Sequence, residues 1–161
     1  QHLPDMVSSD HIFYSQAFAG TVPVRHLLPY WKTSNRYLFS GGSVNMRDAA
    51  VYAKEENWSK AVELWKQTYE TKKGKQKMYA AYNTALGYEM QDSIDTALEW
   101  ALKAQTLARE KSKTDKKETG EIHNGTISYY IFISMYVDEL EKRKEGMARL
   151  NMQMNRFDDD F

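Results

Sequence analysis

The chain has 161 residues, enough for one ordinary domain with a sizeable core or for a domain that carries an added arm. Its 22 basic and 22 acidic side chains cancel, so no overall field favours nucleic acid or an anionic membrane surface as a partner. The chain contains no cysteine, which excludes disulfides, thiolate catalysis and metal sites with cysteine ligands.

Residues 1–44 differ in composition from the rest of the chain. They hold all three prolines and the Gly41-Gly42 pair, and they show no sustained helical periodicity. Prolines and paired glycines without helical periodicity are typical of irregular structure with a short strand or turn. We therefore expect residues 1–44 to form an irregular N-terminal arm.

From residue 45 onward the chain is rich in Ala, Glu, Lys, Met and Tyr and lacks proline, which favours helices. Asn45 is the expected N-cap of a first helix that ends near residue 56, and Asn57 is that of a second helix over WSKAVELWKQTYET. Gly74 suits the C-terminal cap of the second helix.

Three further helices are expected. One covers about 76–91, and the next, SIDTALEWALKAQTLARE, runs to the polar stretch KSKTDKKETG. The last covers about 120–144, because six residues spaced four and three apart share one face: Ile122, Thr126, Tyr129, Ile133, Tyr136 and Leu140. We therefore predict a helical domain over 45–157, followed by an acidic tail at 158–161.

Part of the helical segment repeats itself 36 positions further on. The matching residues are Ala49 with Ala85, Tyr52 with Tyr88, and Ala61 with Ala97. A fixed period in this range is typical of stacked helix pairs. The alanines suit the points where two helices approach most closely. Trp58 and Trp65 are then interpreted as core residues rather than as an aromatic binding site.

This order of small and aromatic residues resembles the tetratricopeptide repeat. The family positions are held in a first repeat, about 42–77, by Ala49, Tyr52, Trp58, Ala61 and Trp65, and in a second, about 78–113, by Ala85, Tyr88, Ile94, Ala97 and Ala101. The usual tryptophan and leucine-glycine at the start of each repeat are missing. The resemblance implies an all-α fold of antiparallel helix pairs, stacked as a short solenoid with a long capping helix at about 120–144.

A narrower resemblance concerns the order of Arg36-Tyr37, the helix with Trp58 and Trp65, YNTALGYE and ALEWALKA. It is similar to a group of uncharacterised lipoproteins of Gram-negative gut bacteria, in which such repeats form the C-terminal half. The resemblance implies a protein of the cell envelope, in the periplasm or outer membrane, attached to the membrane only through a lipid anchor upstream of this chain. A processed product that begins at Gln1 fits that expectation.

The tetratricopeptide register also implies a binding surface on the inner side of the solenoid. Arg47 and Asn83 have the hydrogen-bonding groups to hold a peptide backbone or a carboxylate. Tyrosines beside them would form a groove for a helix or an extended segment. The candidate partner-binding residues are Arg47, Lys54, Tyr79, Tyr82, Asn83 and Glu89.

An alternative places the site in the N-terminal arm. Tyr30, Trp31 and Tyr37 form an aromatic group beside Arg36 that would stack on a sugar ring or another small molecule. A glycan-binding protein predicts that these rings are exposed, whereas a scaffold predicts an exposed groove along the helices.

No signature of catalysis is found. The chain has no phosphate-binding glycine loop and no nucleophile elbow, and its four histidines, at 2, 11, 26 and 123, lack metal-binding spacing. We therefore predict a non-catalytic scaffold that binds a protein or peptide partner, without cofactor or metal and without nucleic acid. The alternative is the glycan- or small-molecule-binding protein described above.

Overall fold

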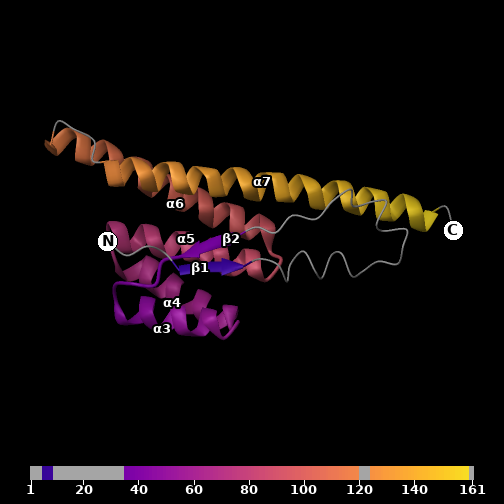
Figure 1. Ribbon diagram of the computed structural model, residues 1–161, viewed down its shortest axis with the longest axis horizontal. Coiled ribbons are helices and arrows are strands. Elements are labelled where there is room, and N and C mark those ends of the chain that lie inside the picture. The colour runs from indigo at the N-terminus through magenta and orange to yellow at the C-terminus, as the bar shows by residue number, and fades with distance from the viewer. Residues whose placement is uncertain (1–4, 9–34, 120–123, 160–161) are drawn as a thin grey trace.

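Figure 1 shows the computed structural model of the chain, which describes residues 5–8, 35–119 and 124–159. Five helices pack against one another, so the all-α class is confirmed. The elements, in chain order, are β1 (Asp5–Ser8), β2 (Asn35–Leu38), α3 (Val44–Lys54), α4 (Trp58–Thr71), α5 (Lys75–Met90), α6 (Ile94–Thr119) and α7 (Asn124–Asp159).

Polar caps set where the first helices begin. The side chain of Asn57 accepts a hydrogen bond from the Lys60 N–H, so it caps α4 as predicted. The cap of α3 is Ser43 instead of Asn45, and its hydroxyl accepts from the Met46 N–H. Gly74 precedes α5 with a φ of +64° and does not end α4. Its left-handed conformation turns the chain into the next helix.

The last two helices are longer than expected. α6 continues to Thr119 through the polar stretch, because lysine and glutamate are good helix formers and no proline or glycine interrupts them. α7 continues past 144 to Asp159, because that stretch contains no proline and is rich in Met, Arg and other residues that a helix tolerates, so the single glycine at 146 does not end it. Two residues of the expected acidic tail therefore form its last turn. At about 1.5 Å per residue, α7 is about 54 Å long, and Figure 1 shows it extending beyond the other helices.

Each helix packs against the next one in the chain, from α3 to α7. The connections from α3 to α6 are only a few residues long, so consecutive helices there are antiparallel neighbours. Figure 1 shows α3 and α4 on one side, α5 and α6 in the middle, and α7 lying along them as an outer layer. No helix in the described part of the chain is long and apolar enough to span a bilayer.

Small residues allow these helices to approach closely. Ala61 and Ala97 are fully buried, and a β-carbon at Gly87 of α5 would lie 2.3 Å from a methyl carbon of Val62 in α4. Trp65 is also fully buried. The interpretation of the tryptophans at 58 and 65 as core residues is therefore confirmed.

Two short strands complete the described chain. β1 and β2 are antiparallel, with Asp5 opposite Leu38 and Ser8 opposite Asn35. Along β2, alternate side chains are buried and exposed, and the strand lies against α5. The strand therefore places residues of the N-terminal arm directly on the helical domain.

Candidate peptide-binding groove

The predicted groove is covered by the chain itself. We call residues 36–39, which comprise most of β2 and the residue after it, the inserted segment. It contacts α5 and α7 through Arg36, Tyr37 and Phe39. Tyr82, Asn83 and Glu89 of α5 are at most 1% exposed. The prediction of an open groove is therefore wrong at these three positions, because the inserted segment and α7 cover them.

Asn83 holds the main chain of the inserted segment. Its Oδ1 accepts a hydrogen bond from the Phe39 N–H at 3.1 Å, and its Nδ2 donates to the Phe39 carbonyl oxygen at 2.7 Å. One buried amide thus satisfies both peptide groups of a residue that has left the strand pairing. Since unsatisfied buried peptide groups are costly, this contact fixes the position of the segment on α5.

The Phe39 side chain lies among four aromatic rings, which we call the aromatic cage. It stacks on Tyr79 with 4.2 Å between ring centroids and an angle of 15° between the planes. The other three rings meet it edge-on, with centroids 5.2 to 6.2 Å away: Tyr82, Tyr129 and Phe132. These are favourable geometries for aromatic pairs. The Tyr79 hydroxyl donates to that of Tyr129 at 2.8 Å, which joins α5 to α7 across the cage.

Arg36 enters a carboxylate pocket at the other end of the segment. Its Nε and Nη2 donate to the two oxygens of Glu89 at 2.9 and 3.0 Å, a bidentate arrangement, and Nη1 donates to Glu139. The guanidinium also lies over the Tyr136 ring, 5.4 Å from its centroid. The carboxylates and the ring recognise both the charge and the plane of an arginine.

Glu89 is the centre of this pocket. Besides the two bonds from Arg36, it accepts hydrogen bonds from the Tyr136 hydroxyl at 3.1 Å and from Arg143 Nη1 at 2.9 Å. Arg143 also donates to Asp92 at 3.2 Å. A fully buried carboxylate is tolerated only with such partners. The four bonds link β2, α5 and α7 at one point.

Burial and charge also set the protonation states around Glu89. Burial lowers the pKa of Arg36, but the hydrogen bond and charge of Glu89 outweigh that effect and hold its pKa above the ordinary value. Burial, and next the charge of Glu89, raises the pKa of Tyr136. Tyr136 is therefore protonated at neutral pH and able to donate its hydrogen bond.

Comparison with known families gives a match. A family model described as Domain of unknown function (DUF6340) matches residues 47–142, which is more than half of the chain. The chain belongs to this family. The DUF6340 region extends from α3 into α7 and includes Asn83, Glu89 and Tyr136, whereas the inserted segment lies outside it. Searches of curated proteins and of solved structures found no match.

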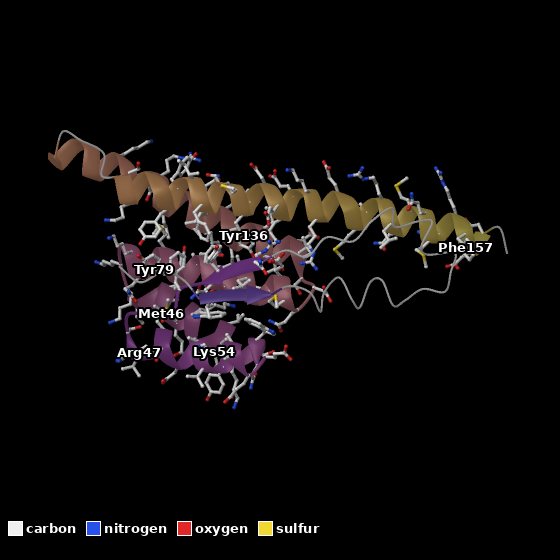
Figure 2. All side chains as sticks on the ribbon, viewed as in Figure 1. Met46, Arg47, Lys54, Tyr79, Tyr136 and Phe157 are labelled. Carbon is white, nitrogen blue, oxygen red and sulfur yellow. The ribbon has the colours of Figure 1, made fainter. Side chains whose placement is uncertain are left out.

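Two predicted partner-binding residues lie apart from the groove. Arg47 and Lys54 are exposed on α3, at the end of the DUF6340 region far from Tyr136, as Figure 2 shows. Val44 and Val51 of the same helix are also exposed. The structure therefore joins Tyr79, Tyr82, Asn83 and Glu89 into one site but does not bring Arg47 or Lys54 to it.

The aromatic group of the alternative prediction is described only in part. Tyr30 and Trp31 lie outside the described residues. Tyr37 is 42% exposed and meets Phe132 edge-on at 5.7 Å. All four histidines also lie outside the described residues, and among those described no cluster of metal-binding side chains is found.

Sequence reasoning missed the residues that occupy the groove. Arg36 and Phe39 fall in the expected irregular arm, and no role is predicted for Arg143. One signal was present in α5, where Asn83 and Glu89 interrupt a segment that is otherwise apolar or small on every side, MYAAYNTALGYEM. Buried polar side chains need partners, so these two positions predict polar groups opposite them.

Proposed function

We propose that this domain is a non-catalytic scaffold that binds an extended peptide segment across α5 and α7. In this chain, residues 36–39 occupy the site. The contact of Asn83 with both peptide groups of Phe39 carries the proposal, because an amide that pairs with a main chain can hold an extended peptide of any sequence. The arginine pocket and the aromatic cage add selectivity for side chains.

The proposal includes a tetratricopeptide-like arrangement of the helices. Two antiparallel pairs, α3 with α4 and α5 with α6, support it. Equivalent alanines of the two pairs, Ala61 and Ala97, are both fully buried. In that arrangement α5 is the first helix of the second pair, and it lines the inner surface on which the inserted segment lies.

The inserted segment competes with any partner for the groove. A covalently linked segment has an effective concentration in the millimolar range, so a free peptide of equal affinity at a lower concentration displaces little of it. Binding of a partner therefore requires the segment to be weakened or withdrawn.

A synthetic peptide of residues 33–41 tests the proposed function. Titrated calorimetrically into the full chain, it should bind an Arg36→Ala/Phe39→Ala variant, whose own segment has lost both anchors, and should not bind the wild type. A peptide with alanine in place of Arg36 and Phe39 is the matched control. If the variant retains its helical circular dichroism but binds neither peptide, the proposed function is wrong.

Location in the cell envelope, with a lipid anchor upstream of this chain, is part of the same proposal and rests on the lipoprotein resemblance. Fractionation of the native source with an antibody to α7 tests it. The protein should appear with the membranes and should be extracted by detergent but not by high salt. Recovery in the soluble fraction contradicts the lipid anchor without affecting the peptide-binding groove.

A further inference from the structure

The inserted segment is joined to α3 by four residues, Ser40-Gly41-Gly42-Ser43, which we call the hinge. Gly42 has a φ of +117°, a conformation that L-residues with side chains rarely adopt. A β-carbon there would also meet the side chain of Gln76, whose Oε1 accepts a hydrogen bond from the Ser43 N–H. The return of the segment onto its own groove therefore depends on a glycine in the hinge.

The contacts that hold the segment do not depend on the hinge. Arg36 is bound by the carboxylate pocket, and Phe39 by Asn83 and the aromatic cage, and all of these groups belong to α5 and α7. The same contacts form whether the segment comes from the same chain or from another chain. Only the hinge conformation and the covalent link distinguish the two cases.

We propose that the groove also takes the inserted segment of a second copy of this chain, so that two copies exchange their segments reciprocally. This inference rests on the proposed function, because it names the partner of the same groove. A second copy is the partner that carries the matching chemistry, an arginine for the Glu89 pocket and an aromatic residue three positions later for the cage. Each groove of such a dimer is completed by Arg36 and Phe39 of its partner.

Reciprocal exchange produces a closed, two-fold dimer. β1 pairs with β2, so the two strands move together and their pairing is kept. Both grooves of the dimer are filled, and among the residues that the structure describes only the contacts of the hinge are lost. The balance between the two forms is therefore set by how readily the hinge adopts its closed conformation and by the effective concentration of the linked segment.

A change in the hinge should shift this balance toward the dimer. Gly42→Val disfavours the φ of the closed hinge and leaves the segment and the groove unaltered. Two hinges are relieved in each dimer, so the dimer association constant should rise by at least about tenfold over that of the wild type. Size-exclusion chromatography with light scattering over a series of concentrations measures it.

Gly74→Val is the matched control. Gly74 also has a positive φ and precedes a helix, but no separately bound segment adjoins it. Its substitution should lower stability without raising the dimer fraction. If Gly42→Val does not fold, deletion of Gly41 and Gly42 serves as the second variant, since a shortened hinge cannot return the segment to its own groove.

Crosslinking shows which chain fills each groove. Tyr37 and Phe132 face each other across the segment and α7, and the native chain has no cysteine, so Tyr37→Cys/Phe132→Cys introduces one defined thiol pair. A short thiol crosslinker should give an internal link with the native hinge and a covalent dimer with Gly42→Val. If Gly42→Val and the deletion variant both give internal links and no covalent dimer, the exchange is overturned. If the peptide of residues 33–41 nevertheless binds, the proposed function stands and only the second copy as partner is rejected.

Discussion

Glu89 is buried completely, yet it places a carboxylate in the last turn of a helix whose buried residues are mostly apolar or small. Two guanidinium groups and a tyrosine hydroxyl surround it, so its hydrogen-bonding capacity is filled and its charge is compensated. Such an arrangement is not a strong source of net stability, because desolvation offsets most of the attraction. The arrangement instead fixes where β2 and α7 lie, since both must reach one point on α5.

Removing the charge of Glu89 should be costly. Glu89→Gln leaves Arg36 and Arg143 buried beside a neutral amide, and we expect the free energy of unfolding to fall by about 3–5 kcal/mol. Urea denaturation followed by circular dichroism measures the change. Asp95→Asn is the control, because the Asp95–Lys144 ion pair is exposed and its loss should leave stability essentially unchanged. Equal effects of the two substitutions would show that Glu89 is not buried.

Asn83 offers a test of the main-chain contact alone. Asn83→Leu keeps the branched shape and the number of side-chain heavy atoms but leaves the Phe39 N–H and C=O without partners, which should cost about 2–4 kcal/mol. Hydrogen exchange of the Phe39 amide should accelerate more than that of amides in α4. Asn45→Leu is the matched control, since the hydrogen bond that the Asn45 side chain makes with Gln67 is exposed. An unchanged exchange rate at Phe39 would rule out the contact.

At the scale of elements, α5 is the central helix of the domain. It packs against α4 and α6, and the inserted segment also lies on it. Few of its residues reach solvent, so its sequence lacks the polar face that most helices have. A helix of this kind must accommodate neighbours on every side, and small residues such as Ala81 and Gly87 make that possible.

Substitution of glycine by alanine should have opposite effects on stability at Gly87 and at Gly146. Gly87→Ala gains about 1 kcal/mol of helix propensity, but its β-carbon would lie 2.3 Å from Val62, and the overpacking costs about 1–3 kcal/mol. The net effect should be destabilising. Gly146→Ala in α7 meets no atom within 4 Å, so it should stabilise the protein by about 0.5–1 kcal/mol. Thermal denaturation of both variants decides the prediction, and stabilisation by Gly87→Ala would contradict the close packing of α4 and α5.

At the scale of the whole molecule, tyrosines connect the separate elements. Tyr79 and Tyr82 of α5 meet Tyr129 and Tyr136 of α7, and Phe39 of the inserted segment lies against three of them. The helical domain and the end of the arm thus share one aromatic core. We expect them to unfold together in a single transition.

This aromatic core predicts a loss of stability in alkali. Burial is the main cause that raises the pKa of Tyr82 and of Tyr136 above the ordinary value, and the charge of Glu89 adds to it. In the unfolded chain both ionise near pH 10. Above that pH the folded state therefore binds more protons than the unfolded state, so stability present below pH 10 is lost as pH rises.

Urea denaturation at a series of pH values from 8 to about 11 measures this effect. Each of the two tyrosines should contribute a slope of up to about 1.4 kcal/mol per pH unit above pH 10. Tyr82→Phe should flatten the slope, whereas the exposed Tyr37→Phe should not. A stability that is constant up to pH 11 would mean that these hydroxyls are accessible to solvent in the folded protein.

Much of the fold could be predicted from the sequence because helices are determined locally. The caps, the absence of proline and the spacing of apolar residues act within a few positions, and they located α3 to α7 with errors mainly at the ends. The burial of Ala61, Trp65 and Ala97 followed from a repeat that is visible in the chain itself.

Only the tertiary structure decided what covers α5. The bonds of Arg36 with Glu89 and of Asn83 with Phe39 join positions 53 and 44 residues apart, and no local pattern specifies such pairs. The sequence by itself determined that α5 carries Asn83 and Glu89 on an apolar helix, and therefore that polar partners were needed. Which partners they are depends on where β2 and α7 lie, since a buried charge or amide is satisfied by whatever group the fold brings within hydrogen-bond distance.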